Sequence, residues 1–542
     1  MTAVAGYDAI VIGAGHNGLT AAAYLGRAGL RTLVLERRGI VGGCCVTAEI
    51  DARAAPGCRV STCAYIASML RPEVIRDLEL ARHGLRMVPL EPAVQAAFPD
   101  GDLVAWWNRR DRLDAELNRI APGEAPAFHR ALDGLKRLAR YLQPFFLEAP
   151  PDTQAKGLRL LTEKYRLWKR LRSMSGHDIT AMTELLAGSL GDYLDRRFQS
   201  EKLKRLILAN SLYGKHGGPY QPGTAVGLLF HLLSGGEEQQ QGWAGHVLGG
   251  MGSITQAMAG ACRGFGVDIR TGAPVAEVEV GNGSARGVVL EDGSRYAARV
   301  VLSNADPKRT FLKLVAPGHL DDAFRRQVAA IKMAGPCAKV NLVLGEEPKL
   351  MGMPVGAAPL RRSIFTLVPT LEQAERCYAV AASGEIPEDL WLDCVVPTLV
   401  DPGLCPAGKH VLSCFVQYLP YRPRQGSWPE RREHLQRQVL EKIGNYAPNV
   451  PGSVIAAQVI TPLDLEVTFG ITEGNIFHGD PNLEQLFFMR PVPGWSQYAT
   501  PINGLYLCGA GAHPGGGVTG APGYNAARKV LRDLKRLKRT LH

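Results

Sequence analysis

Residues 7–47 read as one complete nucleotide-binding βαβ unit, and this stretch restricts the possible folds more strongly than any other. The apolar run of residues 9–12 predicts a strand that leads directly into Gly13-Ala-Gly15-His-Asn-Gly18 and an alanine-rich helix. A second apolar run, residues 32–35, ends at Glu36. This order of strand, glycine loop, helix, strand and acid predicts a doubly wound α/β domain of the Rossmann type.

The three glycines of this loop have different functions. Gly13 allows the tight turn, Gly15 lets backbone N–H groups approach a pyrophosphate, and Gly18 lets the helix pack close to the strand. Glu36 lies where a carboxylate accepts hydrogen bonds from ribose hydroxyls. A second glycine pair, Gly42-Gly43, begins six residues after Glu36. A second place where the backbone can approach the cofactor suits a longer dinucleotide, so the pair favours FAD over NAD. His16 and Asn17, between the glycines, are expected beside the pyrophosphate rather than in catalysis.

A second glycine-rich segment lies near the other end of the chain. Residues 504–517 read as a strand that runs into a loop with the sequence Gly-Ala-Gly-Ala-His-Pro-Gly-Gly-Gly, and a helix follows from about Gly520. Backbone donors and the positive end of a helix again point at a ligand. Both ends of the chain are therefore expected to hold one long cofactor.

The pattern between the two ends changes several times. Residues 111–212 are mostly helical, whereas residues 266–306 contain four short strand-like runs. We therefore expect a discontinuous FAD-binding domain interrupted by two inserted regions. Its three parts are residues 1–110, 251–310 and 501–542, with a helical cap over residues 111–250 and a mixed-sheet substrate domain over residues 311–500.

The charge balance leaves several partners open. The net charge is +11, which suits nucleic acid, an anionic lipid surface or an anionic cofactor, but no nucleic-acid motif with stacked aromatics is present. The first strand starts within ten residues of Met1, and no apolar run reaches membrane-spanning length. We expect a cytoplasmic protein. The basic, aromatic segment of residues 164–172 leaves peripheral membrane contact open beside a simple solvated helix face.

The cysteines argue against a redox disulfide. Eleven cysteines at scattered spacings do not suggest a disulfide framework. Cys44-Cys45 follows the glycine pair, but Glu49 stands where flavin disulfide reductases have their second cysteine. Cys58 and Cys63 have that enzyme class's spacing at a different place, and no second glycine motif for NAD(P)H follows.

Taken together, these motifs resemble one known family. The N-terminal GAGHNGL with Glu36 and Gly42-Gly43, the strand ending VVLSNAD at residues 300–306, and the C-terminal LYLCGAGAHPGGG resemble the phytoene desaturase and carotenoid isomerase family of flavoproteins. Residues 474–479 and 486–491 extend the resemblance, which covers nearly the whole chain. Within the family, the chain looks most like the branch called pyridine nucleotide-disulphide oxidoreductase domain-containing protein 2.

The resemblance implies a glutathione-reductase-type FAD-binding Rossmann domain with an inserted substrate domain, a helical cap and amine-oxidase-like topology. It also implies non-covalent FAD, with Val275 offering backbone groups to the adenine. Many relatives have an aspartate where this chain has Ala510, so backbone donors would replace it. The implied cofactor-binding residues are Gly13, Gly15, Gly18, Glu36, Gly42, Gly43, Val275, Gly509, Gly511 and Gly516.

The resemblance further implies flavin redox chemistry. We expect a dehydrogenase or desaturase that transfers a hydride equivalent from an apolar, isoprenoid or lipid-like substrate to flavin N5, with oxygen or a quinone as acceptor. His478 and His513 are the expected polar neighbours of the flavin ring, and Arg490 could neutralise flavin or substrate charge. Loop-stabilising roles for all three residues stay open. No metal site is expected.

Other functions remain compatible with the sequence. The same topology serves amine and amino-acid oxidases. An aromatic cage with a carboxylate-binding arginine would favour an oxidase of this kind, whereas a long apolar tunnel would favour the desaturase. Redox-neutral isomerisation and a non-catalytic, flavin-bound partner protein are further alternatives. The sequence leaves the substrate, the electron acceptor and the oligomeric state open.

Overall fold

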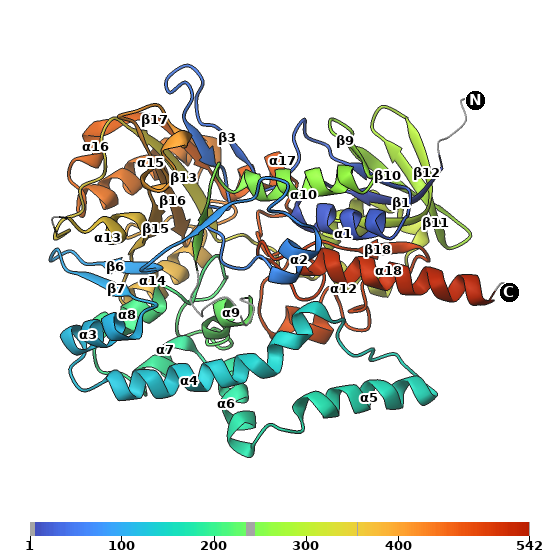
Figure 1. Cartoon of the computed structure of the whole chain (residues 1–542), viewed down its shortest axis with the longest axis horizontal. Coiled ribbons are helices and arrows are strands. Elements are labelled where there is room, and N and C mark those ends of the chain that lie inside the picture. The colour runs from blue at the N-terminus through green and yellow to red at the C-terminus, as the bar shows by residue number, and fades with distance from the viewer. Residues whose placement is uncertain (1–5, 235–243, 355, 541–542) are drawn as a thin grey trace.

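The computed structural model describes residues 6–234, 244–354 and 356–540. Two seven-stranded sheets lie side by side, with a layer of helices below them (Figure 1). The predicted α/β class is confirmed.

The first sheet gathers strands from three distant parts of the chain. Its centre is parallel: β1 pairs with β2 and β12, β2 with β9, and β12 with β18. An antiparallel meander of β10, β11 and β12 forms one edge. The strands predicted from residues 266–306 are confirmed. The members are β1 (Tyr7–Ile12), β2 (Thr32–Leu35), β9 (Asp268–Arg270), β10 (Val275–Gly281), β11 (Ser284–Leu290), β12 (Arg295–Ser303) and β18 (Leu505–Leu507).

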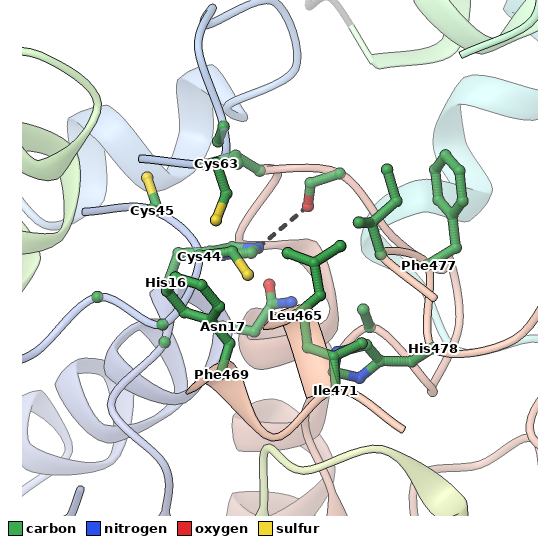
Figure 2. Close-up of a pocket in the computed structure, with 18 of the residues that line it drawn as sticks. His16, Asn17, Cys44, Cys45, Cys63, Leu465, Phe469, Ile471, Phe477 and His478 are labelled. Atoms are coloured by element: carbon green, nitrogen blue, oxygen red, sulfur yellow. Dashed lines mark hydrogen bonds between the residues drawn. The ribbon is translucent and has the colours of Figure 1, made fainter. Parts of the chain in front are cut away.

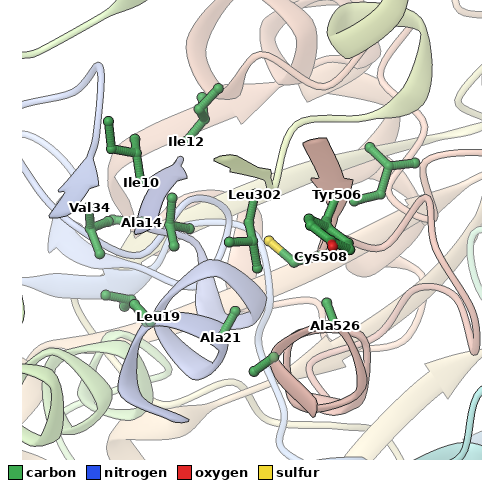
Figure 3. Close-up of a cluster of buried hydrophobic side chains, with 14 of the residues drawn as sticks. Ile10, Ile12, Ala14, Leu19, Ala21, Val34, Leu302, Tyr506, Cys508 and Ala526 are labelled. Carbon is green, nitrogen blue, oxygen red and sulfur yellow. The ribbon is translucent and has the colours of Figure 1, made fainter. Parts of the chain in front are cut away.

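Three helices, α1 (His16–Arg27), α10 (Gly252–Gly264) and α18 (Ala521–Thr540), cover this sheet. Leu302 of β12 points toward α1 and α18, whereas Ile10 and Ile12 of β1 point to the opposite face of the sheet (Figure 3). Parallel strands buried on both faces are continuously apolar, as residues 9–12 of β1 and 33–35 of β2 are. A Cβ on Gly523 would lie 2.0 Å from the Asn17 carbonyl oxygen, so only glycine allows α18 to approach α1 this closely. The two ends of the chain therefore meet at one place.

The second sheet is mostly antiparallel, and its strand β13, which pairs with β17 and β16, is buried along its whole length. Its first two strands in the chain, β6 and β7, lie within residues 1–110, which the sequence assigned to the FAD-binding domain. Strand propensity did not reveal that both strands join the second sheet. In sheet order the strands are β17 (Val454–Ile460), β13 (Cys337–Leu344), β16 (His410–Gln417), β15 (Trp391–Val395), β14 (Ile364–Leu367), β6 (Val94–Ala97) and β7 (Leu103–Trp106).

The cap is helical, as the pattern of residues 111–212 predicted, and it has its own apolar core. Residues 235–243 of the predicted cap lie outside the described part of the chain. The cap elements are α3 (Arg110–Ile120), α4 (Ala125–Leu142), the 3-10 helix η1 (Gln143–Leu147), α5 (Gly157–Leu171), α6 (Gly176–Ala187), α7 (Leu190–Asp195), α8 (Glu201–Leu208) and α9 (Gly227–Ser234).

The remaining elements connect or cover the two sheets. Two small ribbons pair β3 (Thr47–Glu49) with β4 (Arg59–Ser61), and β5 (Met87–Pro89) with β8 (Gly245–Val247). In the described part of the chain, no helix has the length and apolarity needed to cross a bilayer. The other helices are α2 (Pro72–Asp77), α11 (Pro307–Arg309), η2 (Thr310–Leu314), η3 (Pro317–His319), α12 (Asp322–Ala329), α13 (Ala358–Arg362), α14 (Leu371–Ala382), η4 (Pro397–Leu399), η5 (Pro402–Leu404), α15 (Trp428–Gly444), α16 (Val450–Ser453), α17 (Pro462–Phe469), η6 (Leu483–Gln485) and η7 (Phe487–Met489).

Candidate active site

A cavity of about 410 Å³ lies where the two sheets and the cap meet. One end is lined by the glycine loop after β1, the end of β2 and the start of β10. The other is lined by the second sheet and by aromatic side chains that include Phe230 of α9 (Figure 2 shows part of the lining). The cavity thus has a nucleotide-like end and an apolar end.

The glycine loop has the geometry that its spacing predicted. Gly13 has a φ of +94°, and its N–H donates to the Leu35 carbonyl at 2.8 Å. Gly15 is the N-cap of α1 and lines the cavity. A Cβ on Gly18 would lie 2.1 Å from the Gly13 carbonyl oxygen, so glycine is required for this close packing. The first N–H groups of α1 have no partner within the helix and point toward the cavity end.

Glu36 and the second glycine pair complete this end. The Glu36 carboxylate is buried and accepts hydrogen bonds from the backbone N–H groups of Ala14 (2.8 Å) and Arg38 (3.0 Å). Its oxygens keep further lone pairs for hydroxyl donors. Gly42, Gly43 and Val275 line the same end of the cavity, and a Cβ on Gly43 would stand 3.4 Å from the Gly15 Cα.

The C-terminal glycines are packing residues that bring their neighbours to the cavity. A Cβ on Gly509 would lie 2.5 Å from the Asn304 carbonyl oxygen. Added Cβ atoms on Gly511 and Gly516 would lie 2.3 Å from Pro307 Cδ and 2.5 Å from Phe477 Cδ1. These three glycines are not among the lining residues, whereas Ala510, Gly517 and Val518 are.

A direct contact joins the two glycine segments. His16 Nε2 lies 3.0 Å from the Gly517 carbonyl oxygen, across 501 residues of sequence. Burial lowers the pKa of His16 to about 4, so the ring is neutral at pH 7 and donates its Nε2 proton to that carbonyl. This contact holds the two glycine segments together.

Two buried polar atoms at the cavity lack partners within the described residues. These are Asn17 Oδ1 and His478 Nδ1, and both residues line the cavity (Figure 2). Burial also lowers the pKa of His478, which favours the neutral ring. Because buried polar atoms are normally satisfied, these two atoms suit a bound ligand with hydrogen-bonding groups.

His513 and Arg490, the other two predicted catalytic residues, lie outside the cavity lining. His513 Nε2 contacts the Phe145 carbonyl at 2.7 Å, and burial lowers the pKa of the ring to about 4. The buried Arg490 guanidinium donates to four backbone carbonyls, those of Phe477 (2.9 Å), Gly479 (2.6 Å), Gln485 (2.8 Å) and Ala510. Of the three predicted catalytic residues, only His478 faces the cavity.

The sequence did not indicate the apolar end of the cavity, where Lys339, Tyr65 and Phe415 meet. The Tyr65 and Phe415 rings stack with centroids 6.0 Å apart, and Lys339 Nζ lies 4.3 Å from the Tyr65 centroid. Lys339 also donates to Ser413 Oγ at 2.7 Å. Burial lowers its pKa to about 8. A lysine inside a strand that is apolar apart from Lys339 and Asn341 was the one signal that could have revealed this site.

We expect Lys339→Met to raise the free energy of unfolding by about 2 kcal/mol at pH 7. Wild-type Lys339 is charged in both states below pH 8, and only the folded state carries the desolvation penalty. The gain should disappear as the pH rises from 8 through the ordinary value of 10.5, where the lysine becomes neutral in both states. Denaturant unfolding at the two ends of this range measures the effect, with the exposed Lys349→Met as a control expected to change little. Equal stabilisation at both ends would contradict a buried charge at this position.

Comparison with known proteins assigns the family. The family described as flavin containing amine oxidoreductase matches residues 18–531, and the chain belongs to it. The protein is therefore a flavin-dependent oxidoreductase, and the enzyme class expected from the sequence is confirmed.

Relatives match over nearly the full length. The Mus musculus pyridine nucleotide-disulfide oxidoreductase domain-containing protein 2 is 38% identical, covering 98% of this chain and 94% of its own. A limonene dehydrogenase component of Castellaniella defragrans is 26% identical, covering 98% and 96%. A neurosporene-forming phytoene desaturase of Cereibacter sphaeroides is 24% identical with the same coverage. The resemblance inferred from the motifs is confirmed.

Solved structures confirm the fold. Cyclohexylamine oxidase from Brevibacterium oxydans superposes with a TM-score of 0.55 at 18% identity, covering 98% of this chain and 99% of that one. The predicted amine-oxidase-like topology is therefore correct. At this identity the likeness concerns the fold alone.

Proposed function

We propose that the protein binds FAD non-covalently and oxidises an apolar substrate as a dehydrogenase or desaturase. Asn17 Oδ1 and the N–H groups at the start of α1 would meet the cofactor's polar and anionic groups. Glu36 would accept from the ribose, with Val275 and Gly42-Gly43 beside the adenosine half. Gly509, Gly511 and Gly516 would hold the C-terminal loop against the cofactor through their close packing.

One observation carries the choice of substrate: among the residues that the structure describes, the lining at the apolar end of the cavity has a buried cation but no carboxylate. Among the described lining residues the acidic side chains are Glu36 and Glu291. Both belong to the nucleotide end, since the Glu291 N–H donates to the Pro274 carbonyl at 2.9 Å, next to Val275. An ammonium substrate buried beside Lys339 would find no carboxylate in the lining, and the nearby Asp393 is not a lining residue and has its pKa raised to about 7 by burial. A hydrocarbon needs none.

A second cavity supports a long substrate. It has a volume of about 140 Å³, lies inside the cap, and shares Asn210 with the main cavity. Its walls include Phe128, Phe198 and Leu228. An apolar chain could thus continue from the main cavity into the cap. The names of two relatives, a limonene dehydrogenase and a phytoene desaturase, are consistent with apolar substrates.

In this proposal the chain itself supplies orientation and water exclusion. FAD, when bound, would supply the acceptor for a hydride equivalent, with oxygen or a quinone as the final electron acceptor. Tyr65, Phe415 and Phe477 would hold the reacting carbon in an apolar environment. Neutral His478 would hydrogen-bond the cofactor through Nδ1. His513 and Arg490 would act through the loops that they stabilise.

An amine oxidase is the second candidate, because of the aromatic pair. Tyr65 and Phe415 stack on each other and offer an aromatic surface at the site, against which the apolar part of a neutral amine could pack. The fold also serves amine oxidation in the cyclohexylamine oxidase. The neighbouring cation, Lys339, argues against this candidate for an amine that arrives protonated.

The test is anaerobic reduction of the purified holoprotein by candidate donors. Terpene and carotenoid hydrocarbons are expected to bleach the flavin, whereas primary amines and amino acids are not. Bleaching by amines alone would overturn the proposal in favour of the second candidate. Conversion of an isoprenoid without net electron transfer would show a redox-neutral isomerase instead. A flavin that no donor bleaches would favour a non-catalytic role.

A further inference from the structure

The helix α5 (Gly157–Leu171) exposes more large apolar side chains than an ordinary surface helix does. It projects along the lower edge of the molecule, apart from the two sheets (Figure 1). None of its described residues is buried. A surface helix normally turns its apolar stripe toward the core and its charges toward water. In α5, Leu160, Leu167 and Leu171 are half-buried, but the other apolar side chains form a stripe that faces solvent.

The apolar stripe of α5 faces solvent. Leu158, Leu161, Tyr165 and Trp168 are 78%, 63%, 59% and 55% exposed. Their spacing of three, four and three residues places them on one face of the helix. The Tyr165 and Trp168 rings stack with centroids 5.8 Å apart, so the aromatic part of the stripe is ordered. We refer to these four residues as the α5 stripe.

The charged face of α5 is directed toward the rest of the protein. Arg159 pairs with Asp152 at 2.8 Å, and Arg166 and Arg170 pair with Glu148 at 3.5 and 2.5 Å. Between α5 and α18 lies a polar cavity of about 250 Å³ lined largely by arginines and carboxylates. These ion pairs fix the rotation of the helix about its axis, which keeps the α5 stripe outward.

Cations flank the stripe. Lys164 and Lys169 are exposed on α5, and the Arg172 guanidinium lies 5.4 Å from the Trp168 ring centroid. An apolar face bordered by lysines, with an aromatic residue at its edge, is the arrangement that inserts a helix into the headgroup region of an anionic bilayer. A second copy of this chain would bring the same lysines together, so charge favours the lipid surface over self-association.

We propose that α5 docks the protein onto an anionic membrane surface, lying in the plane of the interface with the α5 stripe inserted. The two sheets and the cavity between them would remain on the aqueous side of that surface, since α5 projects away from both sheets (Figure 1). The proposal does not depend on the identity of the substrate.

The test is flotation of the holoprotein with vesicles of phosphatidylcholine alone or mixed with phosphatidylglycerol. The wild type should float with the mixed vesicles and much less with the neutral ones, and salt should weaken the binding. Leu161→Ser combined with Trp168→Ser, and separately Lys164→Glu combined with Lys169→Glu, should each lower partitioning by about tenfold or more. All four positions are outside the core, so folding and flavin content should not change.

The matched control is Val380→Ser combined with Leu483→Ser, which removes exposed apolar side chains elsewhere on the surface. This variant should float like the wild type. Equal flotation of the α5 variants and the wild type would overturn the proposal. So would a solution dimer that the stripe variants abolish, combined with no binding to anionic vesicles, because the stripe would then be a contact between copies.

Discussion

A Gly15→Val protein should fold like the wild type but purify without flavin. Gly15 has φ −70° and ψ 167°, a backbone conformation that valine adopts readily. An added Cβ would lie 2.8 Å from Asn304 Nδ2, the movable end of a side chain. The valine side chain would fill the space through which the cofactor's phosphates would reach the N–H groups at the start of α1. Loss of charge-assisted hydrogen bonds worth about 3 kcal/mol weakens FAD binding by about 100-fold.

The ratio of flavin to protein absorbance measures this effect, and thermal unfolding shows whether the variant is folded. Gly39→Val is the matched control, since Gly39 belongs to the same region, is exposed, and has no atom within 4 Å of an added Cβ. It should keep its flavin. A yellow Gly15→Val protein with wild-type FAD content would show that the glycine loop does not contact the cofactor.

Arg490→Met should destabilise the protein by about 4 kcal/mol. The guanidinium joins the loop carrying Phe477 and Gly479 to the C-terminal glycine segment through Ala510. Methionine would fill similar space but would leave buried carbonyl oxygens without donors. Because these loops line the cavity, we expect flavin to be lost as well. Lysine at this position should not rescue stability, since it lacks the planar fork of donors.

Denaturant unfolding measures the change, with the exposed Arg82→Met as the control, expected within about 0.5 kcal/mol of the wild type. If Arg490→Met were as stable as the wild type but slow in flavin reduction, Arg490 would act on the cofactor or substrate. The role that its hydrogen bonds indicate would then be wrong.

The nucleotide end of the cavity could be predicted because its parts are local in sequence. The turn at Gly13, the close packing at Gly18 and the position of Glu36 follow from a strand, a helix and a second strand that are neighbours in the chain. The second glycine segment was equally visible. Its contact with His16, 501 residues away in the sequence, was not itself predicted. The sequence predicted only that both chain ends hold one ligand.

The apolar end could not be predicted, because strands from different regions build it. Tyr65 follows β4, Lys339 belongs to β13 and Phe415 to β16, and no sequence spacing relates them. The two predicted histidines illustrate the same limit. His478 and His513 both lie in glycine-rich loops, but only the folded chain places one at the cavity and turns the other to the Phe145 carbonyl.

The orientation of α5 shows a further limit of sequence patterns. Its basic and aromatic composition was visible, but an amphipathic pattern does not say which face meets solvent. The ion pairs of Arg159, Arg166 and Arg170 with residues before the helix decide that question in the folded protein.

Titration of the flavin-free wild-type protein with FAD and with FMN tests most directly the claim that both chain ends hold one dinucleotide against an apolar cavity. We expect FAD to saturate at one molecule per chain and to be released intact by acid. FMN should bind far more weakly, because it lacks the adenosine half that would meet Glu36 and Val275. Equal affinity for FMN and FAD, or no uptake of FAD, would contradict the proposed site.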